Sequence, residues 1–153
     1  MYSELRFLDH GVEMGRMIRE HAWWGNPVGT PEDWPQPLRF ALGICMGSRV
    51  PTAIYWGEEL RLFYNDAWAP IPAERHPWAL GQRGQDVFPE IWDVVGPQFA
   101  QVIASGEGFA TFDQRLDMMR GGRTHETYWN YSFTPIRDEY GKVVGILNQG
   151  HET

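Results

Sequence analysis

The sequence predicts an α+β domain: a five-stranded antiparallel sheet with helices on one face, behind an N-terminal amphipathic helix. Three observations carry this prediction. The 153 residues fit one domain with one hydrophobic core. The elements run as helices, two strands, short helices, one longer helix and three strands. Short glycine-containing turns join consecutive strands. The last two strands can therefore return beside the first hairpin, which gives the strand order 2-1-5-4-3.

Residues 1–48 are expected to form a helical leader that packs on a core of residues 49–153. Segment 11–22 has the spacing of an amphipathic helix, with Asp9 as its N-cap and with Met14, Met17, Ile18 and His21 on one face. Such a face needs a partner surface, either its own domain or a second copy of the chain. A capped helical turn is expected after Thr30, and a second helix from Pro37 to about Met46.

The core begins with two strands rich in β-branched and aromatic residues, 52–56 and 60–64, joined by a turn at Gly57. Asn65 is then suited to cap a short helix. A longer helix is expected over 86–106, ending at Gly106, with a kink or a break into two helices around Gly96-Pro97. Three strands follow, joined by turns at Gly121-Gly122 and 138–141, over the segments 109–118, 127–136 and 142–149.

Charge and composition exclude several functions. With 13 Lys and Arg against 20 Asp and Glu, the net charge of −7 disfavours binding to nucleic acid or to an anionic membrane. No run approaches the roughly 18 apolar residues of a membrane helix, and the first residues do not resemble an export signal. The single cysteine, Cys45, allows no disulfide within the chain. We therefore expect a cytoplasmic setting.

The residue pattern contains no complete active site. The five histidines never recur at metal-binding spacing, so no metal site is expected. His125-Glu126 begins like a zinc-protease motif but lacks the second histidine. Cys45 falls on the apolar face of a helix, where a buried thiol is inert. Paired carboxylates stand only in turns, so we expect no catalytic residue in this chain.

Three segments together resemble the PAS family of sensory domains. The first hairpin ends at Tyr64-Asn65, and the small residue Ala67 and the bulky residue Trp68 follow. A Ser-x-x-Pro step starting at Ser132 is followed by an Asp-x-x-Gly turn starting at Asp138 and a valine-rich strand. Segment 34–38, preceded by 27–29, is similar to the leader of PAS domains at the N-terminal end of bacterial sensor histidine kinases. Their order and spacing carry the resemblance over almost the whole chain.

The resemblance implies a signal-input domain of a two-component protein, such as a sensor histidine kinase, which passes its signal to a downstream output domain. It also implies a homodimer, for which the N-terminal helix is the expected contact. Haem and flavin are disfavoured: no cysteine stands between Asn65 and Gly106, and no histidine in 86–106. His76 is the remaining haem candidate. A dissociable small molecule, or no ligand at all, is expected instead.

Aromatic residues make up 14% of the chain, enough either to fill a large core or to line a cavity for a flat ligand. Five of them are the expected lining of a pocket between the sheet and the longer helix: Tyr64, Trp92, Phe99, Trp129 and Tyr131. The same five can equally be core.

Two other functions stay open. One is a small cone-shaped α+β enzyme of the isomerase or lyase type, with an apolar pocket and with His21 and Asp66 as its catalytic pair. The other is a protein-interaction domain with a solid core.

Overall fold

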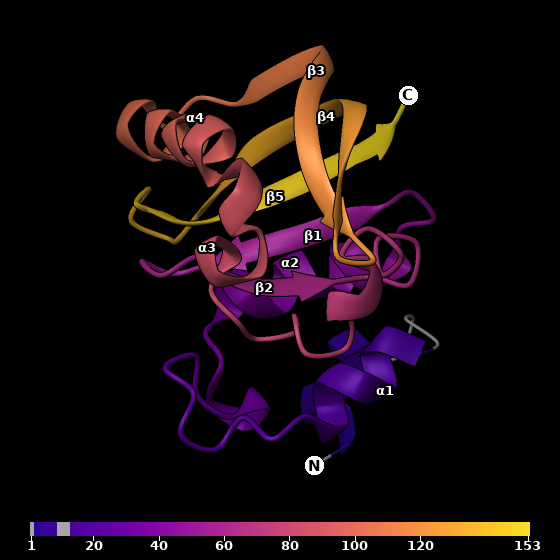
Figure 1. Cartoon of the computed structure of the whole chain (residues 1–153). Coiled ribbons are helices and arrows are strands. Elements are labelled where there is room, and N and C mark those ends of the chain that lie inside the picture. The colour runs from indigo at the N-terminus through magenta and orange to yellow at the C-terminus, as the bar shows by residue number, and fades with distance from the viewer. Residues whose placement is uncertain (1, 9–12) are drawn as a thin grey trace.

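In the computed structural model, which describes residues 2–8 and 13–153, five antiparallel strands form one sheet. The strands pair in the order β2-β1-β5-β4-β3, which confirms the predicted fold class and strand order. Figure 1 shows the long β3–β4 hairpin rising at one side of the sheet and the short β1–β2 hairpin at the other. The strands are β1 (Thr52–Trp56), β2 (Arg61–Tyr64), β3 (Phe109–Arg120), β4 (Arg123–Arg137) and β5 (Val143–Glu152).

The strands of the second half are longer than the sequence pattern predicts. Alternation of apolar and polar residues marks only their buried parts, whereas the backbone pairing continues through the polar ends, for example from Met118↔His125 to Arg120↔Arg123. Gly121 and Gly122 both have positive φ values, 59° and 76°, so this tight turn needs glycine. A register shift between Thr111 and Gln114 interrupts the β3–β4 pairing.

One face of the sheet carries the helices of the middle segment (Figure 1). These are α3 (Gly84–Val87), a 3-10 turn (Pro89–Ile91) and α4 (Trp92–Ser105), and Gly106 ends α4 with a left-handed φ of 70° as expected. The expected division into two helices around Gly96-Pro97 is wrong, because α4 runs through both residues. Pro97 lies in the second turn of α4, and the break comes earlier, at Phe88-Pro89, where Phe88 leaves helical geometry.

The N-terminal segment packs against the β1–β2 hairpin from the other face (Figure 1). It contains a 3-10 helix η1 (Tyr2–Leu8), α1 (Glu13–Glu20), a 3-10 turn (Pro31–Asp33) and α2 (Gln36–Gly47). Phe63 points to this face, where its ring stacks on Trp23 at 5.1 Å and meets Trp34 edge-on at 5.2 Å. The leader thus shares the core of the sheet domain.

The apolar face of α1 is covered within the chain. Met14 and Ile18 are buried, and Met17 is half-buried. The Asp66 carboxylate accepts hydrogen bonds from the backbone N–H groups of Glu13 and Met14, at 3.2 and 2.8 Å, at the start of this helix. Asp9, the predicted cap, and residues 10–12 lie outside the described residues. The apolar face of α1 was expected to pack either on the chain's own domain or on a second copy of the chain. In the structure it packs on the chain's own domain.

Among the described residues, no helix combines the length and apolarity needed to cross a membrane.

Candidate functional site

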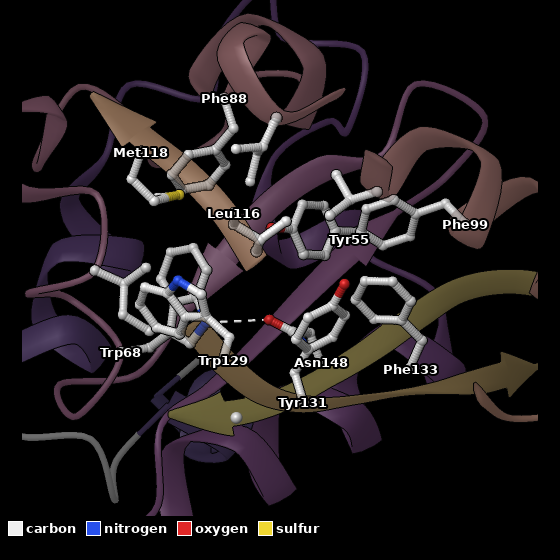
Figure 2. A pocket seen from close by; sticks show the side chains of 14 residues that line it. Tyr55, Trp68, Phe88, Phe99, Leu116, Met118, Trp129, Tyr131, Phe133 and Asn148 are labelled. Carbon is white, nitrogen blue, oxygen red and sulfur yellow. Dashed lines mark hydrogen bonds between the residues drawn. The ribbon is translucent and has the colours of Figure 1, made fainter. Parts of the chain in front are cut away.

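A largely apolar cavity of about 60 Å³ lies between α4 and the sheet. The sheet and the helices of the middle segment both contribute to it, and Figure 2 shows the side chains converging from the strands below and the helices above. Within the described part of the chain, no charged side chain lines it. The lining comprises Tyr55, Trp68, Ile71, Phe88, Ile91, Val95, Phe99, Leu116, Met118, Trp129, Tyr131, Phe133, Asn148 and Gly150.

Strand alternation and helical spacing bring these side chains together. On β4, Trp129, Tyr131 and Phe133 are two residues apart and therefore share a face. On α4, Val95 and Phe99 are one turn apart and face them. The Phe99 ring is stacked on Phe133, with centroids 4.2 Å apart, so helix and sheet are in direct contact at one end of the cavity.

Three of the five expected lining residues, Phe99, Trp129 and Tyr131, line the cavity. Tyr64 and Trp92 lie outside the lining. The Tyr64 hydroxyl is 2.6 Å from Nδ1 of His76, in the segment beside β2. Trp92 stacks on Phe99 at 5.3 Å and supports it from outside.

Three lining residues with polar groups, Tyr55, Trp68 and Asn148, were missed. Asn148 had a signal in the sequence, because an amide in an otherwise apolar strand segment, Ile146-Leu147-Asn148, is unusual. Tyr55 had none, since four consecutive residues of β1 are buried and the pattern does not separate its two faces.

Four polar groups of the lining have partners inside the protein. Asn148 accepts a hydrogen bond from Trp68 Nε1 at 3.2 Å and donates one to the Ser132 carbonyl. Trp129 Nε1 donates to Thr127 Oγ1 at 2.7 Å. The Tyr131 hydroxyl donates to Gln98 Oε1 at 2.6 Å. These groups are held in fixed directions by the fold.

The Tyr55 hydroxyl differs. Within the described part of the chain it makes no hydrogen bond, although the residue is only 5% exposed. No sealed side-chain oxygen or nitrogen there lacks a partner, so the Tyr55 oxygen must border open space. Burial raises its pKa, and Tyr131 raises it further, so the group stays protonated and can both donate and accept.

No protein-family model matches the sequence, and no curated protein is similar to it in sequence. Solved structures do share its fold. The PAS domain of a protein from Colwellia psychrerythraea superposes with a TM-score of 0.51 at 14% identity, over 67% of this chain and 86% of that one. The chain has the PAS fold. A sensory box sensor histidine kinase from Vibrio cholerae is similar as well, with a TM-score of 0.50 at 14% identity over 68% and 78%. An RNA-binding light-oxygen-voltage receptor gives 0.56 at 17% identity, over 77% of this chain and 34% of the receptor.

The cavity of this chain does not fit haem or flavin. A volume of about 60 Å³ holds roughly four to six water-sized groups, well short of a porphyrin or a three-ring flavin. No histidine or cysteine is among the described residues that line it. His76 is engaged by Tyr64 outside the lining, and Cys45, whose pKa burial raises to about 12, is buried in α2. No group of three His, Cys, Asp or Glu side chains among the described residues can hold a metal ion.

The alternative catalytic pair, His21 and Asp66, is not assembled in the structure. Asp66 caps α1, and the His21 ring packs against Trp23 at 4.3 Å. In the part of the chain that is described, no hydrogen bond or ion pair joins His21 to Asp66, and neither residue lines the apolar cavity. A structural role accounts for both side chains, so this pair supplies no acid and base for an enzyme.

Proposed function

We propose that this chain is the signal-input domain of a two-component protein, such as a sensor histidine kinase, and that a small molecule in the cavity sets its signalling state. The observation that carries this proposal is the apolar cavity between α4 and the sheet, lined by rings from both layers. The similarity to the Vibrio cholerae sensor histidine kinase supports the kinase context. Any catalysis then belongs to an output domain, not to residues 2–8 and 13–153.

The competing function, a protein-interaction domain, predicts a solid core without a cavity. A core packed for stability alone leaves few voids larger than one water molecule. Here the space is several times that size and has polar groups on its wall. The cavity therefore favours ligand binding over interaction alone.

A chain of contacts runs from the cavity to the end of β5. The Arg120 guanidinium lies over the Trp129 ring, 5.7 Å from its centroid, and pairs with Glu152 at 3.0 Å. Trp129 lines the cavity, and Glu152 is the last residue of β5. A ligand that shifts the indole therefore also shifts the ion pair at the C-terminal end of the sheet. We include this relay in the proposal.

The dimer has weaker support than the cavity. Its expected contact was the apolar face of α1, and that face is buried within the chain. Deleting residues 1–22 should therefore lower stability, because it removes Phe7, whose ring packs on Trp34 at 6.3 Å, and the Ile18 carbonyl, which accepts a hydrogen bond from Trp23 Nε1 at 2.7 Å. Light scattering of the full and truncated chains tests the dimer: a change from dimer to monomer on truncation supports the N-terminal contact, and an unchanged oligomeric state contradicts it.

Native mass spectrometry with an absorption spectrum of the purified protein tests the proposed function. We expect a colourless protein that carries a small non-covalent mass, lost in a Leu116→Phe variant whose added ring fills the cavity. Circular dichroism checks that the variant is folded. Visible absorption would contradict the exclusion of haem and flavin. A bound mass that survives in the folded variant would place the ligand elsewhere.

The relay is tested by hydrogen exchange of residues 143–153 with and without phenol as a cavity probe. Exchange should change on probe addition in the wild type and in the control Arg115→Gln, which breaks an exposed ion pair to Asp117 on the same strand. It should no longer change in Arg120→Gln. An equal response in both variants would contradict the relay.

A further inference from the structure

The Tyr55 side chain is held rigidly, so its hydroxyl has a fixed direction. The ring packs on Phe99 at 4.6 Å. On another side α3 approaches so closely that a Cβ on Gly84 would lie 2.8 Å from the ring edge. A ring confined in this way cannot rotate its hydroxyl towards a distant partner. In Figure 2 the hydroxyl oxygen of Tyr55 points from β1 into the group of lining side chains.

A polar group in this position is unusual. Almost all buried polar groups in folded proteins form a hydrogen bond. The Tyr55 oxygen has no partner among the described residues but borders open space, so the partner it can take there is a water molecule or a ligand atom. Phenylalanine would fill the same space without needing such a partner. Packing alone therefore does not explain a tyrosine at this position. Its neighbours in the lining, Asn148 and Tyr131, do not bond to its hydroxyl, because their own hydrogen bonds go to other residues.

The remaining properties of the cavity restrict its ligand. With no charged side chain in the described lining, an ionised ligand would stay uncompensated, so the ligand is neutral. The rings of Phe88, Trp129 and Phe133 favour a flat molecule. The volume of about 60 Å³ limits the ligand to at most one six-membered ring with a small substituent.

Resting on the proposed function, we infer that the cavity selects a compact, neutral, aromatic molecule with one hydrogen-bonding substituent, and that the Tyr55 hydroxyl is the group that recognises this substituent. Tyr55 is thus the specificity-determining residue of the site. The surrounding rings bind the flat body of the ligand and contribute affinity without discriminating the substituent.

Two probes of nearly equal shape, phenol and toluene, test the assignment, because only phenol has a hydrogen-bonding substituent. Dissociation constants are measured by quenching of tryptophan fluorescence in the wild type and in Tyr55→Phe. We expect Tyr55→Phe to weaken phenol binding about three- to tenfold and to leave toluene binding unchanged. Tyr131→Phe is the matched control. It removes a hydroxyl from the same lining that already has a partner, so it should affect both probes to the same extent.

The outcomes distinguish a failure of the Tyr55 assignment from a failure of the proposed ligand-binding function. If both probes bind and Tyr55→Phe changes them equally, the assignment of Tyr55 is wrong while the ligand-binding function stands. If neither probe binds the wild type at millimolar concentration, the proposed function fails together with the assignment. A Tyr55→Phe protein that does not fold, as judged by circular dichroism, would show that the hydroxyl is structural and would also overturn the assignment.

Discussion

Replacing Asn65 by alanine removes a side chain that ties the first hairpin to α2 and to the segment that positions Trp68 at the cavity. Its Oδ1 accepts hydrogen bonds from the backbone N–H groups of Thr52 and Trp68, at 3.1 and 3.0 Å. The residue is 2% exposed, so water cannot replace these bonds. Its Nδ2 is within 3.2 Å of three carbonyl oxygens, those of Cys45, Ser48 and Val50.

The expected loss follows from these contacts. The two N–H hydrogens and the oxygen supply about four full hydrogen bonds, each worth roughly 1 kcal/mol net. Asn65→Ala should therefore lower the free energy of unfolding by about 4 kcal/mol. For a domain of this size, that is a fall in Tm of about 8–16 °C.

Urea denaturation followed by circular dichroism measures the effect of Asn65→Ala. The control is Asn130→Ala, which makes the same chemical change at a half-buried site on β4 where one backbone N–H, that of Asp113, bonds to the amide oxygen at 2.8 Å. We expect about 1 kcal/mol for the control. Similar losses in the two variants would refute the role of Asn65 as a bridge between the hairpin and α2.

Two further predictions concern pH and packing. Burial lowers the pKa of His76 from its usual 6.5, and Asp66 opposes this shift. As the pH falls, His76 therefore takes up its proton more readily in the unfolded chain than in the folded one. The His76 contribution to stability is complete above about pH 6.5 and is lost as the pH drops below that value. His76→Asn should reduce the fall in Tm between pH 7.5 and pH 5.5. If the fall in Tm is unchanged in this variant, other groups cause it, such as His21, whose pKa is also lowered by burial. Gly84→Ala should push the Tyr55 ring into the cavity, lower the free energy of unfolding by about 1–3 kcal/mol and weaken phenol binding. If fluorescence titration shows that the variant binds phenol with wild-type affinity, this account of the packing is wrong.

The sheet was predictable because its signals are local. Trp129, Tyr131 and Phe133 alternate with polar residues, and glycine marks the turn between β3 and β4, so faces and connections follow from the sequence. Asn65 was expected to cap a short helix. Its side chain does accept a bond from the N–H of Trp68, but residues 66–72 form turns and no helix. The bonds of Asn65 to Cys45 in α2 and to Val50 beyond it could not be foreseen, because they join residues 20 and 15 positions apart.

The site was only partly predictable, since lining a cavity depends on where an element ends relative to its neighbours. Tyr64 and Trp92 are aromatic and stand on the correct elements. However, β2 is an edge strand, so Tyr64 reaches His76 instead of the cavity, and Trp92 is the first residue of α4. For the apolar face of α1, spacing alone does not distinguish a contact within the chain from a contact with a second copy.

The most direct test of the central claim is a methyl-labelled NMR titration of the protein with phenol. Shifts are expected at methyl groups that line the cavity, such as those of Ile91, Leu116 and Met118. The methyls of Leu38 and Leu42, buried in α2, should not move. Saturable shifts confined to the lining are the result that our account predicts. Shifts spread over the surface, or none at the lining, would contradict a ligand cavity between α4 and the sheet.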